Sequence, residues 1–114
     1  MRIWHEDLIS KLCQKHLCAM WREGLGAYKI ITEDKKGYCN HPAVKEFEHA
    51  PQTLLTRLLQ VYFESKNRGY SFNIKLVDAN KLDHIIHKEP KIIEWQSLEK
   101  QIEVLHGKNC ECKV

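Results

Sequence analysis

Apolar residues recur at helical spacing in three stretches of this chain, with polar residues filling the positions between them. The first stretch covers residues 7–21, and the glycines that follow it, Gly24 and Gly26, are expected to end that helix. The second opens at Pro51, a residue suited to a first helical turn, and runs to about residue 67, with Gly69 as its terminator. The third starts after Pro90 and closes at Gly107.

The same spacing predicts which face of each helix is buried. The predicted stripes are Leu8, Ile9, Leu12, Cys13, His16, Leu17 and Met20 on the first helix; Leu54, Leu55, Leu58, Leu59 and Tyr62, widened by Val61 and Phe63, on the second; and Ile92, Trp95, Leu98, Ile102 and Leu105 on the third. Within the predicted stripes, Cys13 acts as a small hydrophobic residue. Trp4, ahead of the first helix, is either a core anchor or a wedge that stacks on a base, and we favour the core.

The connections are less regular than the helices. We expect an extended piece or short strand over residues 28–31, a turn over 34–37, a short helix over 42–49, an extended piece over 72–74 and one or two helical turns over 79–87. The chain has no internal repeat and no linker rich in Gly, Ser or Pro. The expected fold class is therefore mainly α, a compact single domain over residues 1–114 with three principal helices and irregular connections.

Composition narrows the class of protein. The chain has 114 residues, 43% of them hydrophobic and 29% charged, which suits one globular core. No apolar run approaches the ~18 residues of a membrane span, and the charged start is unlike a signal peptide. Five cysteines, an odd number, favour reduced thiols and a cytoplasmic location. The sequence leaves the oligomeric state open, and we favour a monomer. A net charge of +3 is compatible with nucleic-acid binding but does not require it.

Three features of the first helix and its approach bear on chemistry. Arg2 is bulky, so Met1 is expected to be retained, and its α-amine, with an ordinary pKa of about 7.7–8.0, is partly neutral near pH 7. Such an amine can attack a sugar carbon and form an imine, although most chain ends simply fray. Glu23 beside Arg22 is either a solvated ion pair or a catalytic carboxylate. His16 on the apolar stripe is either a core residue or a functional one.

A metal site is the second chemical option that the sequence offers. His84 and His87 would share one helix face, and His106 precedes Cys110 and Cys112. Zinc requires four such ligands in a closed set, and these pairs do not match a recognised spacing. We therefore expect no metal site and no cofactor.

Two stretches of the chain resemble the pyrimidine-dimer DNA glycosylase/AP lyase family, the phage endonuclease V type. Arg2-Ile3 followed by the H-L-x-A-x-W-R-E pattern of residues 16–23 is similar to the opening of that family. Residues 54–62, with Arg68-Gly69-Tyr70 and Phe72-Asn73-Ile74 after them, are similar to its central helix and the segment that follows. The resemblance covers about half of the chain and implies a compact helical enzyme that acts on DNA.

The resemblance also implies roles for individual residues. The Met1 amine takes the place of the nucleophile that attacks C1′ of the damaged nucleotide, and Glu23 takes the acid/base place. Arg2 and Arg22 take the phosphate-contacting places, and His16 that of the histidine at the edge of the active site. Apart from the resemblance, a scattered set of basic residues is expected to give weak, salt-sensitive DNA binding; it consists of Lys11, Lys15, Arg22, Arg57, Lys66 and Arg68.

The expected function is that of a DNA repair glycosylase, an abasic-site lyase, or both, acting through an imine on damaged or abasic duplex. Two alternatives stay open. One is a helical nucleic-acid-binding protein without turnover, and the other is a small cytoplasmic protein that binds a metal or ligand on the same fold.

Overall fold

The computed structural model describes residues 2–33, 41–77, 96–108 and 110–114 of the chain, and all regular elements within them are helical. In order, these elements are the 3₁₀ helix η1 (Glu6–Lys11), α1 (Gln14–Thr32), α2 (Pro42–Phe47), α3 (Pro51–Asn67), the 3₁₀ helix η2 (Ile74–Leu76) and α4 (Leu98–His106). The expected mainly helical fold with three principal helices is confirmed. None of the helices in the described part is long and apolar enough to cross a membrane.

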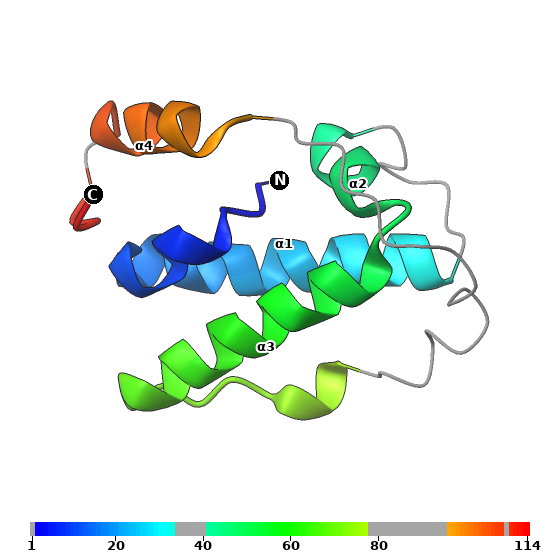
Figure 1. The fold of residues 1–114 in the computed structure, drawn as a ribbon. Helices are drawn as coiled ribbons and strands as arrows, with labels where there is room; N and C mark the ends of the chain where they lie inside the picture. The colour runs from blue at the N-terminus through cyan, green and yellow to red at the C-terminus, as the bar shows by residue number, and fades with distance from the viewer. Residues whose placement is uncertain (1, 34–40, 78–95, 109) are drawn as a thin grey trace.

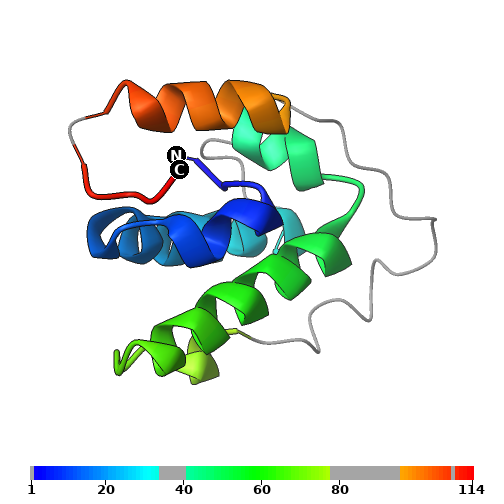
Figure 2. The same cartoon turned by 60° about the vertical axis from the view of Figure 1, so that its left-hand side comes forward.

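Helix α1 is the centre of the molecule. Figure 1 shows α3 packed along one side of α1 and α4 on the opposite side, with the amino-terminal segment between α1 and α4. The turned view in Figure 2 shows the same order of elements. Helix α2 packs against both α1 and α3 near one end of the bundle. The start of the chain is therefore held inside the bundle, between two helices.

The first predicted helix is divided in two by an extended joint. Leu12 and Cys13 have extended backbone conformations, with ψ values of 142° and 167°, so η1 ends before them and α1 begins after them. Cys13 is the N-cap residue of α1, and the expectation that it packs as a small hydrophobic residue inside the helix was wrong. The carbonyl of Lys11 accepts a hydrogen bond of 2.7 Å from the Lys113 amide, so the C-terminal segment lies against this joint.

The prediction that Gly24 and Gly26 end the first helix was wrong. Helix α1 continues through Gly24 and Gly26 to Thr32, so the expected strand over residues 28–31 was also wrong. The physical reason at Gly24 is close packing, because a Cβ atom there would lie 2.7 Å from Cδ2 of Leu58 on α3. Glycine lets the two helices approach, and Tyr28 is buried on the continuation of α1.

The other helix boundaries follow the sequence more closely. Helix α3 ends in a Schellman motif, in which Gly69 has φ +83° and the Tyr70 amide donates to the Ser65 carbonyl at 2.8 Å. The short helix expected over 42–49 is α2, which begins with Pro42 at its first turn. Helix α4 is closed by Gly107, as expected, but it begins at Leu98 with Ser97 as its N-cap, so the expected start directly after Pro90 was wrong. The predicted turn over 34–37 and the helical turns over 79–87 lie outside the described residues.

One apolar core joins the elements. Its largest fully buried apolar side chains are Leu8 from η1, Leu12 from the joint after it, Leu17 and Met20 from α1, Phe47 from α2, Leu54, Leu58 and Val61 from α3, and Leu105 from α4. Trp4 is 3% exposed, so the core role favoured for it is confirmed. Phe63 is 60% exposed and does not widen the α3 stripe, because the buried face of α3 runs through Leu54, Leu58, Val61 and Ser65 instead.

Replacing Gly24 by alanine tests the close approach of α1 and α3. Overpacking against Leu58 costs about 1–3 kcal/mol, and the better helix propensity of alanine offsets up to about 1 kcal/mol. We therefore expect Gly24→Ala to lower the free energy of unfolding by about 1 kcal/mol, measured by urea denaturation.

The matched control is Gly107→Ala, where the new Cβ would lie 3.6 Å from the nearest atom, an ordinary contact. It should change stability by less than about 0.5 kcal/mol. In a Leu58→Ala background, Gly24→Ala should cost less than in the wild-type protein. Equal effects of the two glycine substitutions would contradict the packing argument.

Candidate active site

Three helices hold the amino-terminal segment through its backbone. The Arg2 amide donates to Oε2 of Glu23 on α1 at 2.6 Å, and the His5 amide donates to Oε1 of Gln101 on α4 at 2.7 Å. Between them, the Trp4 carbonyl accepts a hydrogen bond of 3.4 Å from Arg57 on α3. A free chain end normally frays, whereas this one is fixed from residue 2 onward.

The segment runs along one face of α1 in the opposite direction to the helix. His16 and Glu23 are seven residues apart, so they lie on the same face about two turns from each other. The Trp4 ring meets the edge of the His16 ring, with centroids 6.1 Å apart and planes at 83°. The Arg2 guanidinium lies 4.7 Å from the centre of the Trp4 ring and donates to the side chain of Gln96. This stack orients Arg2 above the end of the face that carries Glu23.

Two carboxylates surround the Arg2 guanidinium. Burial lowers the pKa of Arg2, and the negative charges of Glu23 and Glu46 act in the opposite direction. Glu46 is 4% exposed and forms an ion pair of 4.0 Å with Arg57, which is 7% exposed. Arg57 also lies over the Phe47 ring at 4.9 Å. The region around Glu23 is thus a partly buried set of opposite charges rather than a purely acidic or basic surface.

Sequence reasoning did not single out Glu46, Gln96 or Gln101. It placed Arg57 only among scattered basic residues for DNA binding, and this was wrong, because Arg57 is buried and paired with Glu46. Glu46, Arg57 and Gln101 are all buried polar side chains. The available signal was a charged residue inside an apolar stripe, as at Arg57 between Leu54 and Leu58 on α3. Such a residue requires a buried partner, but the sequence alone does not say which.

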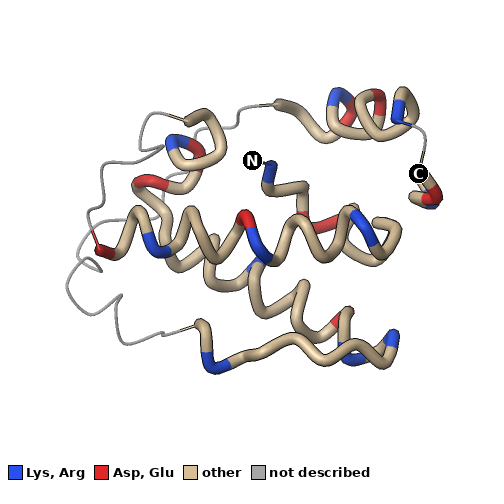
Figure 3. Tube along the Cα trace, turned by 180° about the vertical axis from the view of Figure 1, so that it is seen from behind, with Lys and Arg blue, Asp and Glu red and all other residues tan. Residues whose placement is uncertain are grey.

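The remaining residues expected at the site lie on or near α1. Arg22 and Lys15 are both exposed and, being seven residues apart, share one face of the helix. Basic and acidic positions are interspersed along the described helices, as Figure 3 shows, so these two residues do not belong to a uniformly basic surface. Met1 lies outside the described residues.

His16 has sulfur neighbours as well as Trp4. Its Nδ1 lies 3.1 Å from Sγ of Cys13 and 3.3 Å from Sγ of Cys112. Burial lowers the pKa of His16, and the nearby charges of Lys108 and Lys15 lower it further, which favours the neutral imidazole. The structure thus brings His16 next to thiols at one end of the α1 face, while Glu23 stands at the other end.

The two thiols beside His16 have different acidities. For Cys13, burial favours the neutral thiol, but hydrogen bonds from backbone groups, first that of His16, and from Cys112 outweigh burial and lower its pKa. For Cys112, burial and the neighbouring thiols of Cys110 and Cys13 raise the pKa to about 12. The Cys13 thiol thus releases its proton more readily than the Cys112 thiol, as expected for two neighbouring thiols whose titrations are linked.

The metal option considered from the sequence involved a different set of residues. His84 and His87 lie outside the described residues, and His106 is exposed at the end of α4. Cys110 and Cys112 instead meet Cys13 and His16, and the four ligand atoms lie within 4.8 Å of one another. The sequence signal for this grouping was the Cys13-x-x-His16 spacing. It was not recognised because both residues had been assigned to the apolar stripe of the first predicted helix.

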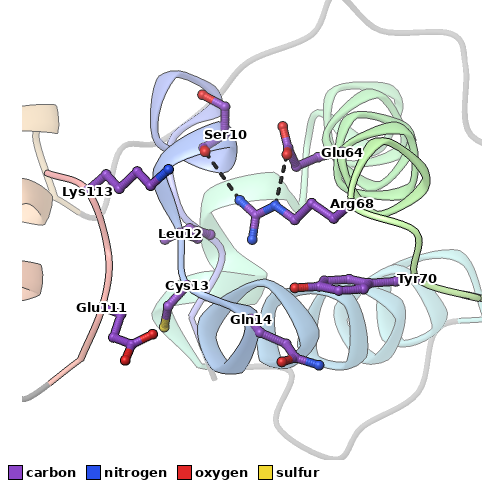
Figure 4. A pocket seen from close by; sticks show the side chains of 9 residues that line it. All are labelled: Ser10, Leu12, Cys13, Gln14, Glu64, Arg68, Tyr70, Glu111 and Lys113. Carbon is purple, nitrogen blue, oxygen red and sulfur yellow. Dashed lines mark hydrogen bonds and ion pairs between the residues drawn. The ribbon is translucent and has the colours of Figure 1, made fainter.

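A cleft of about 500 Å³ lies beside the cysteine cluster rather than at Glu23. It is bounded by η1, the start of α1, the end of α3 and the C-terminal segment, and Cys13 lines it (Figure 4). Across it, Arg68 donates to Glu64 at 2.9 Å and to the Ser10 carbonyl at 3.2 Å. These contacts engage the Arg68 guanidinium seen in Figure 4. Neither Arg2 nor Glu23 lines this cleft, so it is separate from the Glu23 region.

Comparison with protein families decides which group this arrangement belongs to. Residues 1–78, which include the amino-terminal segment, α1, α2 and α3, match the family described as pyrimidine dimer DNA glycosylase. The chain belongs to this family. The resemblance seen in residues 2–23 and 54–74 is thereby confirmed. No curated protein and no solved structure matches the chain. Membership in the pyrimidine dimer DNA glycosylase family suggests glycosylase activity and a DNA substrate.

Removing the buried carboxylate that pairs with Arg57 is expected to destabilise this glycosylase-family protein strongly. Glu46→Ala removes the α2 carboxylate that pairs with Arg57, while the positive charge of Arg57 stays buried. Breaking a buried ion pair in this way costs about 3–5 kcal/mol. The free energy of unfolding from urea denaturation measures this cost.

Glu48→Ala is the matched control, two residues further along. Glu48 forms an exposed pair with Lys45 at 3.2 Å, so its removal should change stability by less than about 0.5 kcal/mol. Similar small effects of both substitutions would show that the Glu46–Arg57 pair does not support the site.

Proposed function

We propose that this protein is a DNA glycosylase and abasic-site lyase in which the α-amine of Met1 is the nucleophile and Glu23 is the acid/base group. The observation that supports the proposal is the 2.6 Å hydrogen bond from the Arg2 amide to Oε2 of Glu23. Consecutive backbone nitrogens are separated by at most about 3.6 Å. Covalent geometry alone therefore limits the distance from an amine one residue before Arg2 to this Glu23 oxygen to at most about 6 Å.

The proposed reaction starts at the sugar of the damaged nucleotide. The neutral amine forms a bond to C1′ while the glycosidic C1′–N bond breaks, and the base leaves with the bonding electrons and a proton. The nitrogen lone pair then forms a C1′=N double bond as the C1′–O4′ bond opens, and O4′ takes a proton. A carboxylate next to C1′ stabilises the positive charge that develops on the sugar.

The imine allows the lyase step. Electron withdrawal by the iminium acidifies the C2′ proton, and a base removes it. The electron pair forms a C2′=C3′ double bond as the C3′–O bond breaks, so the 3′ phosphate leaves. Water then hydrolyses the imine and releases the amine. In this scheme Glu23 carries protons to and from the sugar, and no cofactor takes part.

Basic residues along α1 supply the proposed contacts to DNA. Arg22 and Lys15 are exposed on one face of the helix, and their positive charges suit backbone phosphates. Arg2, half-buried beside Glu23, favours the neutral form of an adjacent amine and suits a phosphate flanking the lesion. His16 stands at the far end of the same face, behind Trp4, at the edge of the proposed site.

Trapping with borohydride tests the imine directly. Wild-type protein, with its amino terminus verified by mass, is incubated with abasic-site duplex and then with borohydride, which reduces the imine to a stable covalent bond. We expect a trapped protein–DNA band with wild-type protein and none after the terminal amine is blocked. Glu23→Gln should slow strand cleavage by about 10²–10⁴-fold, the usual contribution of a general acid/base group.

The matched control is Glu48→Gln, which changes an exposed carboxylate at the C-cap of α2 and should leave the reaction at the wild-type rate. Undiminished trapping after the amine is blocked would remove Met1 from the mechanism. DNA binding without any trapped band would favour a nucleic-acid-binding protein without turnover. Wild-type strand cleavage by Glu23→Gln would eliminate the acid/base role.

Salt dependence of binding tests the contact through Arg22. Each phosphate contact contributes about −0.9 to the slope of log K against log salt, so losing one contact makes the slope shallower by about 0.9. We expect Arg22→Ala to weaken binding to an abasic duplex and to make this slope shallower by about 0.9, the contribution of one phosphate contact. Fluorescence anisotropy over a salt series measures both effects. Lys75→Ala on η2, exposed beyond α3, should leave both values unchanged. Equal slopes for Arg22→Ala and wild-type protein would exclude a phosphate contact at Arg22.

A further inference from the structure

Four ligand atoms of the kind that bind transition metals meet at the start of α1. They belong to Cys13, His16, Cys110 and Cys112, and all lie within 4.8 Å of one another. The shortest separations join the His16 Nδ1 atom to the sulfurs of Cys13, at 3.1 Å, and Cys112, at 3.3 Å. Cys112 packs against the apolar core, but neither this contact nor the proposed DNA chemistry requires four ligand atoms to meet.

The size of the cluster matches one tetrahedral ion. With Zn–S bonds of about 2.3 Å and Zn–N bonds of about 2.0–2.1 Å, the edges of a tetrahedral site measure about 3.5–3.8 Å. The observed separations bracket these edges, from 3.1 Å to the upper limit of 4.8 Å. An ion at the centre requires side-chain shifts of a few tenths of an ångström to about one ångström, with no movement of a helix.

The ligand types select the metal. Three sulfurs and one imidazole nitrogen form a soft set that favours zinc, whereas magnesium and calcium require oxygen ligands. A site with four protein ligands leaves no position for substrate, which is the arrangement of structural rather than catalytic zinc. All four residues are half-buried, so an ion can enter from solvent and is then largely enclosed.

The backbone around the cluster is already arranged for a ligated sulfur. The Cys13 amide donates to Sγ of Cys112 at 3.1 Å, across 99 residues of sequence, and hydrogen bonds of this kind stabilise the thiolate form of a ligand. The Lys113 amide bonds to the Lys11 carbonyl at 2.7 Å, which fixes the C-terminal segment beside the N-cap of α1. Lys15 and Lys108 lie within electrostatic range of His16 and offset the negative charge that three thiolates bring.

We propose that Cys13, His16, Cys110 and Cys112 bind one zinc ion that fastens the C-terminal segment to the start of α1. On binding, each of the three thiols releases its proton to solvent, and the imidazole binds through a neutral nitrogen. Because His16 also packs edge-on against Trp4, the ion fixes one end of the face on which the amino-terminal segment lies. The assignment is independent of the proposed DNA activity.

The decisive experiment titrates cobalt into metal-free wild-type protein, kept reduced and under inert gas. We expect one equivalent to bind with the intense visible bands of a tetrahedral thiolate site, and zinc to displace it. Native mass spectrometry of zinc-loaded protein should show the mass of one ion. Binding below one equivalent, or the weak spectrum of an octahedral site, would overturn the proposal. So would a mass lower by two hydrogens under these conditions, which identifies a disulfide.

A pair of cysteine variants locates the site on the chain. Cys112→Ser should lose stoichiometric cobalt binding, while Cys18→Ser is the matched control, because Cys18 also lies on the first turns of α1 but outside the cluster. Circular dichroism checks that both variants are folded, and if Cys112→Ser does not fold, the wild-type titration still decides. Equal cobalt binding by the two variants would refute the assigned ligands, whatever the trapping experiment on abasic DNA shows.

Discussion

The contact between the Arg2 amide and the Glu23 carboxylate is the constraint on which the candidate active site depends. The first residues of a chain are usually the least ordered, so a site built on them requires an anchor. The 2.6 Å hydrogen bond from the Arg2 amide makes Glu23 that anchor. One side chain thus holds the segment and faces the space where chemistry would occur.

Polar anchors alone would be a weak way to hold a chain end, since each net hydrogen bond contributes only about 1 kcal/mol. Ile3 and Trp4 add buried apolar surface, because both are 3% exposed. The Glu46–Arg57 pair then presents a guanidinium to the Trp4 carbonyl without an isolated buried charge. Apolar burial supplies most of the stability of the segment, and the hydrogen bonds set its register along α1.

The sequence predicted helices well where one local signal dominates and poorly where a tertiary contact decides. Pro51 and Gly69 bound α3 as expected, since a proline at the first turn and a positive φ at the end are properties of single residues. Gly24 was misinterpreted as a terminator because the reason for it, the Leu58 side chain, lies 34 positions away on another helix. The joint at Leu12 and Cys13 was missed for a similar reason, because its partner, the C-terminal segment, is distant in sequence.

The candidate site shows the same division. Arg2, Arg22 and Glu23 were indicated by resemblance in two short motifs, whereas the pairing of Glu46 with Arg57 became visible only when α2 and α3 were packed together. Likewise, the spacing of Cys110 and Cys112 was noticed, but their partners were sought among His84, His87 and His106. Pairing between distant segments is the information that a single sequence does not carry.

The absence of a side chain at Gly24 has a consequence for engineering. Gly24 is the direct neighbour of Glu23, so the depth to which α1 settles on α3 also sets the rotation of α1 about its axis and the direction in which Glu23 points. Thermostabilising programmes often replace helical glycines by alanine. At this position the new side chain would press against Leu58 and shift the Glu23 carboxylate relative to the Arg2 amide, so Gly24 is a glycine that such programmes should leave in place.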